Sequence, residues 1–425
     1  MAKNWYKLDN AAKIFPAIFT KKDTNSFRIS SLFYENINPD ALQKSIQEAL
    51  VRFPTFCVKL KRGFFWYYFE HNNKKPIIME ENSIAFDSVR LYKNNGYLFT
   101  LSYHERRLTL EVFHALSDGT GSMEFFKCIC YYYLLFLGHD IENTGEIKTQ
   151  DVEQNIAESD DSFNLNYDQK IKKHSNEGKA FQLKGRSYNN RWVGLIHAQM
   201  DVSNLKEAAH RYDATITEYI GGVILFSIYN LYFKDRKQKR SAKLFFPVNA
   251  RKYFDSNTLR NFALYVRTTC DLNKLSSLSL KESIEIIKDT FNNELTKEKL
   301  LSRIVSNVSM ERLWIVRILP LFIKNIAMRI GYKVLGSDVN TLSFSNLGEV
   351  KLPKEMGNYI ERFEFTIGAS KATPINFSSV SYNGIFVLTI STKHIDRDLI
   401  RNVIRQFSSD GIHITLESNN LEVDD

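Results

Sequence analysis

Cysteine is scarce in this sequence of 425 residues, which contains only Cys57, Cys128, Cys130 and Cys270. No two of them form a C-x-x-C pair. Cys128 and Cys130 stand two residues apart in an apolar helical stretch, so their side chains point to different faces and are poorly placed to share a metal ion. We therefore expect reduced, buried thiols, no metal site and a cytoplasmic protein.

Long apolar runs are also missing. The longest run, Cys128 to Leu137, is too short to span a bilayer. The first ten residues contain no apolar core of the kind that marks a signal peptide. The motifs of zinc hydrolases (H-E-x-x-H), of serine hydrolases (G-x-S-x-G) and of phosphate loops do not occur either. These absences predict a soluble intracellular protein without metal-dependent or nucleotide-dependent chemistry.

The composition is that of an ordinary globular protein, with 44% hydrophobic and 25% charged residues. Aromatic residues make up 13%, mostly Phe and Tyr, which favours β-rich cores and apolar ligand tunnels. The net charge of +9 can attract a polyanion such as CoA or the acidic surface of a carrier protein, or it can serve solubility alone. The clustered basic motif of a nucleic-acid reader is absent, so we expect no nucleic-acid partner.

The strongest functional signal lies in one stretch, Leu108 to Ser122, which reads L-T-L-E-V-F-H-A-L-S-D-G-T-G-S. Apolar and polar residues alternate up to His114, which predicts a strand, and S-D-G-T-G-S then predicts a turn before an apolar helix at 123–137. A neutral imidazole at such a strand end can take a proton from an alcohol or amine near neutral pH. The structural alternative is a buried histidine satisfied by the backbone, with Asp118 capping the helix.

Periodicity predicts further elements on both sides of this stretch. A helix opens at Asn38-Pro39-Asp40, and a hairpin joins 56–60 to 64–69 through Lys61-Arg62-Gly63. Gly221-Gly222 in an apolar helix indicate close backbone packing. The remaining strands are expected at 27–34, 97–103, 193–200, 262–270, 363–366, 375–382 and 385–392, and the remaining helices at 203–212, 217–233, 280–301 and 396–409.

The segment V-F-H-A-L-S-D-G-T-G resembles the H-x-x-x-D-G motif of the chloramphenicol-acetyltransferase-like, CoA-dependent acyltransferase superfamily. This superfamily includes condensation domains, and the sequence looks most similar to bacterial alcohol acetyltransferase-like proteins. The resemblance implies an α/β fold of the α+β type, with two sandwich subdomains and an active-site tunnel between them. It implies His114 as general base and Asp118 and Gly119 as structural residues of the active site. It also implies acetyl-CoA or another acyl-CoA as co-substrate, with no bound cofactor.

Two later segments resemble other signatures of the superfamily. P-V-N-A-R, ending at Arg251, is similar to a signature whose arginine forms a buried ion pair with the motif aspartate, which implies a pair between Arg251 and Asp118. T-L-S-F-S-N-L-G-E-V, at 341–350, is similar to a stretch that shapes the tunnel beside the CoA site. Asn261 falls near an asparagine that recurs in such proteins. The candidate oxyanion and tunnel residues are Ser343, Ser345, Asn346 and Gly348.

The composition changes between about residues 140 and 190, where large aliphatic residues are few. We expect a linker or covering strap there, with an N-terminal subdomain at 1–165 that carries H-x-x-x-D-G and a C-terminal subdomain at 166–425. Farther on, residues 313–334 set cations among large apolar side chains. This pattern is typical either of a membrane-surface helix or of a helix pair broken at Pro320 that packs on its own domain.

The sequence thus predicts a CoA-dependent O- or N-acyltransferase that acts on a small alcohol or amine. Condensation domains usually carry two adjacent histidines, and here Phe113 occupies the first position. This difference keeps an alternative open, a non-catalytic binding protein of the same fold that docks an acyl carrier protein or, weakly, a membrane surface.

Overall fold

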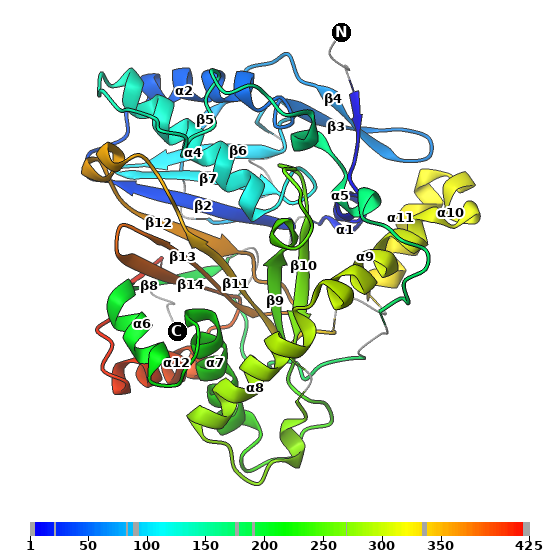
Figure 1. Ribbon diagram of the computed structural model, residues 1–425, viewed down its shortest axis with the longest axis vertical. Coiled ribbons are helices and arrows are strands. Elements are labelled where there is room, and N and C mark those ends of the chain that lie inside the picture. Colours follow the sequence, from blue (N-terminus) through cyan, green and yellow to red (C-terminus); the bar gives the residue numbers. More distant parts are fainter. Residues whose placement is uncertain are drawn as a thin grey trace.

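The computed structural model (Figure 1) has two α/β sandwiches whose sheets face each other, with helices on the outer sides. A small third sheet of β1 (Trp5–Lys7), β4 (Tyr67–His71) and β3 (Val58–Arg62) extends the N-terminal part. The structure describes residues 5–20, 23–81, 84–87, 93–174, 178–188, 192–268, 270–333 and 338–419.

The N-terminal sandwich is built on a five-stranded sheet in the order β12-β2-β7-β6-β5. Helices α2 (Pro39–Arg52) and α4 (Gly119–Phe136) cover one face of it. Helix α2 begins as predicted, because the Asn38 side chain accepts hydrogen bonds from the amides of Asp40 and Ala41. The strands of the five-stranded sheet are β12 (Ile360–Ile367), β2 (Ser26–Phe33), β7 (Arg107–Phe113), β6 (Phe99–His104) and β5 (Ile78–Glu80).

The C-terminal sandwich is built on a seven-stranded sheet in the order β10-β9-β11-β13-β14-β8-β15. Its core includes side chains of the helices α6 (Val202–His210), α7 (Ile216–Tyr232), α8 (Leu280–Glu294) and α12 (Asp398–Ser409). Its strands are β8 (Gly194–Asp201), β9 (Leu244–Asn249), β10 (Ala263–Arg267), β11 (Leu342–Glu349), β13 (Ile375–Tyr382), β14 (Ile385–Thr392) and β15 (Thr415–Ser418).

Strand β12 connects the two sandwiches. It follows β11 in the sequence, yet it pairs antiparallel with β2 in the N-terminal sheet and packs against β13 and β14. A division of the chain at residue 165 therefore does not separate the two sheets completely, because β12 lies after this residue and belongs to the N-terminal sheet. The predicted subdomain boundary stays a prediction. The predicted linker region contains the short helix α5 (Ser162–Leu165), and Phe163 is buried against Phe262. This part is an ordered strap.

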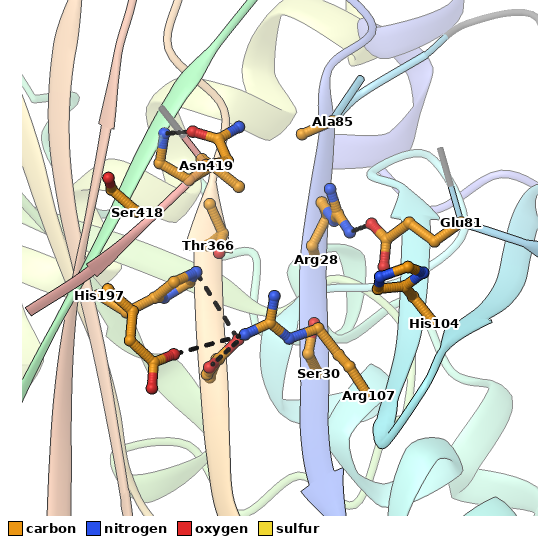
Figure 2. Close-up of a pocket in the computed structure, with 13 residues that line it drawn as sticks. Arg28, Ser30, Glu81, Ala85, His104, Arg107, His197, Thr366, Ser418 and Asn419 are labelled. Atoms are coloured by element: carbon orange, nitrogen blue, oxygen red, sulfur yellow. Dashed lines mark hydrogen bonds and ion pairs between the residues drawn. The ribbon is translucent and has the colours of Figure 1, made fainter. Parts of the chain in front are cut away.

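A cluster of titratable side chains joins the facing sheets (Figure 2). Glu364 of β12 accepts a hydrogen bond from Arg107 of β7 at 3.2 Å, and it lies 3.7 Å from the His197 ring of β8. Arg28 of β2 pairs with Glu81 beside them. These groups line a cavity of about 420 Å³. The cluster fixes how the sheets are placed relative to each other.

Several predicted boundaries are wrong, and helix α4, for example, begins at Gly119 and not at residue 123. The single helix expected at 280–301 is two helices, α8 and α9 (Lys297–Arg312), because Thr296 accepts a hydrogen bond from the Lys299 amide and starts a new helix. The first hairpin turns at 63–66 and not at 61–63. The segment after α9 forms α10 (Trp314–Ile318) and α11 (Leu321–Gly331), separated at Pro320 as expected, and α11 packs on α1 (Phe15–Ile18).

Candidate active site

His114 directly follows β7 and is half-buried between aromatic rings. The ring of Phe15 stacks on the imidazole with centroids 4.6 Å apart and planes 14° apart, and Phe27 meets it edge-on at 5.2 Å. The backbone amide of His114 donates to the carbonyl of Asn25 at 3.0 Å. The strand end and the two rings therefore hold the imidazole in one orientation.

The Nδ1 atom of His114 lies 3.0 Å from Oδ1 of Asn261. Nδ2 of Asn261 donates to Oδ2 of Asp9 at 3.2 Å, which directs Oδ1 of the amide toward the imidazole. An amide oxygen can only accept, so Nδ1 carries the proton and Nε2 is left with a free lone pair. This is the tautomer that a general base needs.

Asp9, at the end of this chain of contacts, is fully buried. It accepts hydrogen bonds from the Ala12 amide at 2.8 Å and from Asn261, and Nε of Arg260 lies 3.5 Å away. Burial raises the pKa of Asp9, and Arg260 opposes this shift. Because the Ala12 amide and Asn261 both donate to it, the carboxyl group acts as an acceptor that orients Asn261.

Asp118 lies away from the imidazole nitrogens and forms a structural link. Its carboxylate accepts two hydrogen bonds from Arg251, at 2.9 and 3.1 Å, and one from the Phe262 amide at 2.8 Å. It also caps α4 by accepting from the Gly121 amide at 3.0 Å. The bidentate pair and the cap together tie the turn after His114 to the C-terminal half.

Close contacts restrict the two glycines at the start of α4. A Cβ atom on Gly119 would lie 2.8 Å from a side-chain carbon of Leu347. On Gly121 it would lie 2.1 Å from the carbonyl oxygen of Leu259, a distance that no side chain tolerates. Gly121, which the motif analysis passed over, is therefore the more restricted of the two.

A cavity of about 530 Å³ opens at His114, between the two sheets. His114, Asp118, Gly119 and strand β12 line it from the N-terminal sandwich, and strands β9 and β11 contribute the opposite walls. All four predicted residues of β11 line it too, namely Ser343, Ser345, Asn346 and Gly348. The structure thus brings these predicted site residues to one cavity, while Arg251 lies behind it as the partner of Asp118.

The β11 residues are held in place by polar contacts. Asn346 donates to Oγ1 of Thr217 at 3.0 Å and accepts from the Gly348 amide at 2.8 Å. Gly348 has φ +81°, and the pairing of β11 with β13 shifts register between Asn346 and Glu349. This bulge turns the strand end toward the cavity. Ser345 is buried there, and Ser343 is fixed through its amide, which donates to Asn376 at 2.8 Å.

The sequence analysis missed Asp9, Phe15 and Asn25, and it gave Asn261 little weight. No local pattern marks the first three as site residues, because each is joined to His114 only through the tertiary fold. In the described ranges, no three His, Cys, Asp or Glu side chains are close enough together to hold a metal ion. Across the same ranges, none of the helices combines the length and apolarity needed to cross a bilayer.

The fold is shared with several solved acyltransferases and related proteins. Polyketide synthase associated protein 5 from Mycobacterium tuberculosis matches with a TM-score of 0.62 and 12% identity, over 95% of this chain and 96% of that one. TRI3 trichothecene 15-O-acetyltransferase from Fusarium sporotrichioides matches with a TM-score of 0.61 and 10% identity, over 96% and 97% of the two chains.

F. graminearum TRI101, solved with coenzyme A and T-2 mycotoxin, matches with a TM-score of 0.58 and 11% identity, over 98% of this chain and all of that one. At such identities these matches establish the fold. No curated protein sequence matches the chain significantly.

The alcohol acetyltransferase family has a sequence model that matches residues 139–407, more than half of the chain. The matched range begins after His114, so it does not include the H-x-x-x-D-G motif. The motif in the N-terminal half and the family model in the C-terminal half are therefore separate indications of the same family. The predicted superfamily and its two-sandwich fold are confirmed. The chain belongs to the alcohol acetyltransferase family, whose fold is that of CoA-dependent acyltransferases.

Proposed function

We propose that this protein transfers an acyl group, acetyl in the simplest case, from a CoA thioester to the hydroxyl or amino group of an acceptor, with His114 as general base. One observation carries the proposal. His114 opens into the cavity between the sheets with its Nδ1 proton held by Asn261, so its Nε2 lone pair is available to a substrate.

In the proposed step, Nε2 of His114 removes the proton from the acceptor O–H or N–H as the acceptor attacks the thioester carbonyl. The carbonyl oxygen becomes a tetrahedral oxyanion. Its collapse breaks the carbon–sulfur bond, and the imidazolium returns its proton to the CoA thiolate. The products are the acylated acceptor and free CoA, and no acyl-enzyme forms.

Asp118 is not available to support the imidazole during this step, because Arg251 and two backbone amides occupy its carboxylate. A neutral amide, Asn261, takes the position that a carboxylate holds in a catalytic triad. The imidazolium therefore gains no direct carboxylate contact, which favours prompt return of the proton to the leaving thiolate.

The oxyanion needs hydrogen-bond donors that face the thioester. The hydroxyls of Ser343 and Ser345 belong to the cavity wall contributed by β11, and we assign them this role. Loss of one such donor typically lowers kcat by about 10²–10³-fold. Ser343→Ala and Ser345→Ala, assayed separately for kcat, distinguish the donor from a wall residue.

The test is thiol release from acetyl-CoA with a panel of alcohols and amines. We expect His114→Ala to lower kcat by about 10²–10⁴-fold, the usual contribution of a general base. His413→Ala is the matched control, since His413 is exposed and lies outside the cavity. Full turnover by the His114→Ala protein would reject the assignment, and no turnover by the native chain with any acceptor would favour a binding protein.

A further inference from the structure

The outer surface of α10 and α11 is apolar. Trp314 is 72% exposed, Ile318 59% and Ile326 55%, and Phe322 and Ile330 are similarly exposed. No residue of α10 is buried, and only Leu321 and Lys324 of α11 are. A surface helix normally turns its apolar side to the core, and here that side faces outward. Figure 1 shows the two helices at one edge of the molecule.

Polar contacts hold α11 in this inverted orientation. Nζ of Lys324 donates to the Phe65 carbonyl at 2.9 Å and lies 3.8 Å from the ring centre of Trp66, both in the turn of the β3–β4 hairpin. Asn325 donates to the Tyr67 hydroxyl at 3.0 Å. Lys324, one of the cations at 313–334, is therefore an internal anchor and not a surface charge. The exposed apolar face is a built feature.

The hairpin turn enlarges the same surface. Its carbonyl at Phe64 accepts from the Leu321 amide at 2.8 Å, and the side chain of Phe64 is 71% exposed beside α11. Aromatic and aliphatic side chains from two separate elements thus form one exposed patch. Single exposed apolar residues are common on protein surfaces, whereas a contiguous exposed apolar patch marks an interaction site.

The charges carried by the segment that forms α10 and α11 have one sign. Between Arg312 and Lys333 the sequence contains no acidic residue. Four of its cations are exposed, namely Arg312, Arg317, Arg329 and Lys333. A basic rim around aromatic and aliphatic side chains matches the interface of an anionic lipid bilayer, where the apolar groups enter the headgroup boundary and the cations meet the phosphates.

The helix that carries the patch adjoins the active-site cavity. Helix α11 packs on α1, and Nε of Arg329 donates to the Ala17 carbonyl at 2.6 Å. Phe15 of the same short helix stacks on His114. Tyr332, one residue beyond α11, lines the cavity itself. Helix α11 thus carries the apolar surface on one side and adjoins the wall of the cavity, through α1 and Tyr332, on another.

We infer that the α10–α11 surface docks on an anionic bilayer and presents the cavity to an amphiphilic alcohol held there. This inference rests on the proposed function for the identity of the acceptor, whereas the docking itself does not. Docking on an anionic bilayer explains why the apolar face of α11 points outward, why the exposed charges of this segment are basic, and why α11 packs on α1 near the cavity.

Docking is tested by co-sedimentation of the native chain with vesicles, without acyl-CoA. Two vesicle preparations are compared, one of phosphatidylcholine mixed with the anionic lipid phosphatidylglycerol and one of pure phosphatidylcholine. We expect binding to the mixed vesicles, weaker binding at high salt, and a blue shift of tryptophan emission as Trp314 enters the interface. Trp314→Glu/Ile318→Glu should lower the bound fraction about tenfold or more.

The matched control is Val51→Glu/Ile156→Glu, which adds the same charges at two exposed apolar residues of the N-terminal half. It should bind as the native chain does. If the glutamate pair at α10 lowers the thermal midpoint, Trp314→Ala/Ile318→Ala replaces it, since this pair removes apolar area without adding charge.

Three results would overturn the docking inference: no binding of the native chain, equal binding by the α10 variants, or a native dimer that these variants dissociate in the absence of vesicle binding. The last result would mean that a second copy covers the face. Binding by His114→Ala should equal that of the native chain.

The acceptor class is tested in a separate experiment. It compares the rate of acylation of a long-chain alcohol held in mixed vesicles with the rate of acylation of a short soluble alcohol. A higher rate with the vesicle-borne alcohol supports the inference, and a higher rate with the soluble one contradicts it. Vesicle binding without acylation of any alcohol would remove the proposed function, and with it the acceptor class, while leaving the docking intact.

Discussion

The imidazole of His114 is positioned by groups that are far from it in the sequence. Phe15 stacks on the ring, Asn25 binds its backbone, and Asn261 binds Nδ1 under the control of Asp9. The three residues that contact His114 directly, Phe15, Asn25 and Asn261, are all neutral. Their combined effect is to select one ring orientation and one tautomer.

Asn261 should therefore act as a positioning residue. We expect Asn261→Ala to lower kcat about tenfold or more with little change in KM for acyl-CoA, because the imidazole is then free to place its proton on Nε2. Nitrogen NMR of the imidazole should show the Nδ1–H tautomer in the native chain and a mixture in the variant. Asn273→Ala, which removes a comparable hydrogen-bonded amide far from the site, is the control. Equal kcat losses in both variants would reduce Asn261 to a stabilising role.

The Arg251–Asp118 pair should affect stability more strongly than an exposed pair does. Both side chains are nearly buried, with 11% and 5% exposure. Arg251→Met leaves the aspartate without its cation, and we expect a loss of roughly 3–5 kcal/mol in the free energy of unfolding. Arg401→Met breaks an exposed pair with Asp398 and should cost less than about 1 kcal/mol. Urea denaturation measures both values, and similar losses would contradict the structural role of Asp118.

At the scale of elements, the packing of α7 on α8 depends on the glycines of α7. A Cβ atom on Gly222 would lie 2.3 Å from a side-chain carbon of Ile284 and 2.8 Å from its Cα, whereas on Gly221 it would meet ring atoms of Phe246 at 3.1 Å. The Ser283 hydroxyl also donates to the Gly222 carbonyl at 3.0 Å. The prediction of close backbone packing from Gly221-Gly222 is confirmed.

Gly222→Ala should therefore destabilise the protein, although alanine is the better helix former by about 1 kcal/mol. We expect a net loss of about 1–3 kcal/mol, because backbone atoms of α8 must move to admit the methyl group. Gly221→Ala should cost less, since only side-chain atoms of Phe246 and Ile287 have to shift by a few tenths of an ångström. The midpoints of chemical denaturation of the two variants are compared. A larger loss of stability in Gly221→Ala than in Gly222→Ala would show that α7 and α8 separate easily.

Helix boundaries show where periodicity is a weak guide. The apolar pattern of 280–301 continues through Thr296, so it predicts one helix, yet the side chain of Thr296 caps a second one. The outward apolar face of α11 is a second such case, because periodicity identifies an amphipathic helix without saying which side faces the core.

At the scale of the whole molecule, charged residues between the sheets make stability depend on pH. Burial works to raise the pKa of Glu364, but His197, Arg107 and Arg362 outweigh it and lower the pKa to about 2 from 4.5. Burial also lowers the pKa of His197, so this ring is neutral near pH 7 and the two arginines supply the lasting charge.

A carboxyl group whose pKa is lowered by folding stabilises the fold fully above its unfolded pKa, here 4.5, and loses that contribution as the pH falls toward 2. The contribution of Glu364 is up to about 3 kcal/mol. Glu364→Gln should destabilise the protein near pH 7 and flatten the fall in unfolding free energy between about pH 5 and pH 3. Urea denaturation over this range tests it, and an unchanged slope would show that other carboxylates control acid unfolding.

The sequence by itself determined the class of the fold, the strand–turn–helix that carries His114, Asp118 and Gly119, and the family resemblance. Each of these follows from residues that are close in the chain, where alternation, turn residues and motif spacing act directly. Tertiary structure alone decided that β12 joins the first sheet, that Asp9 and Asn261 fix the imidazole tautomer, and that α11 faces outward. These depend on contacts between residues up to hundreds of positions apart, and no local pattern encodes which distant side chain will complete a hydrogen bond or cover an apolar face.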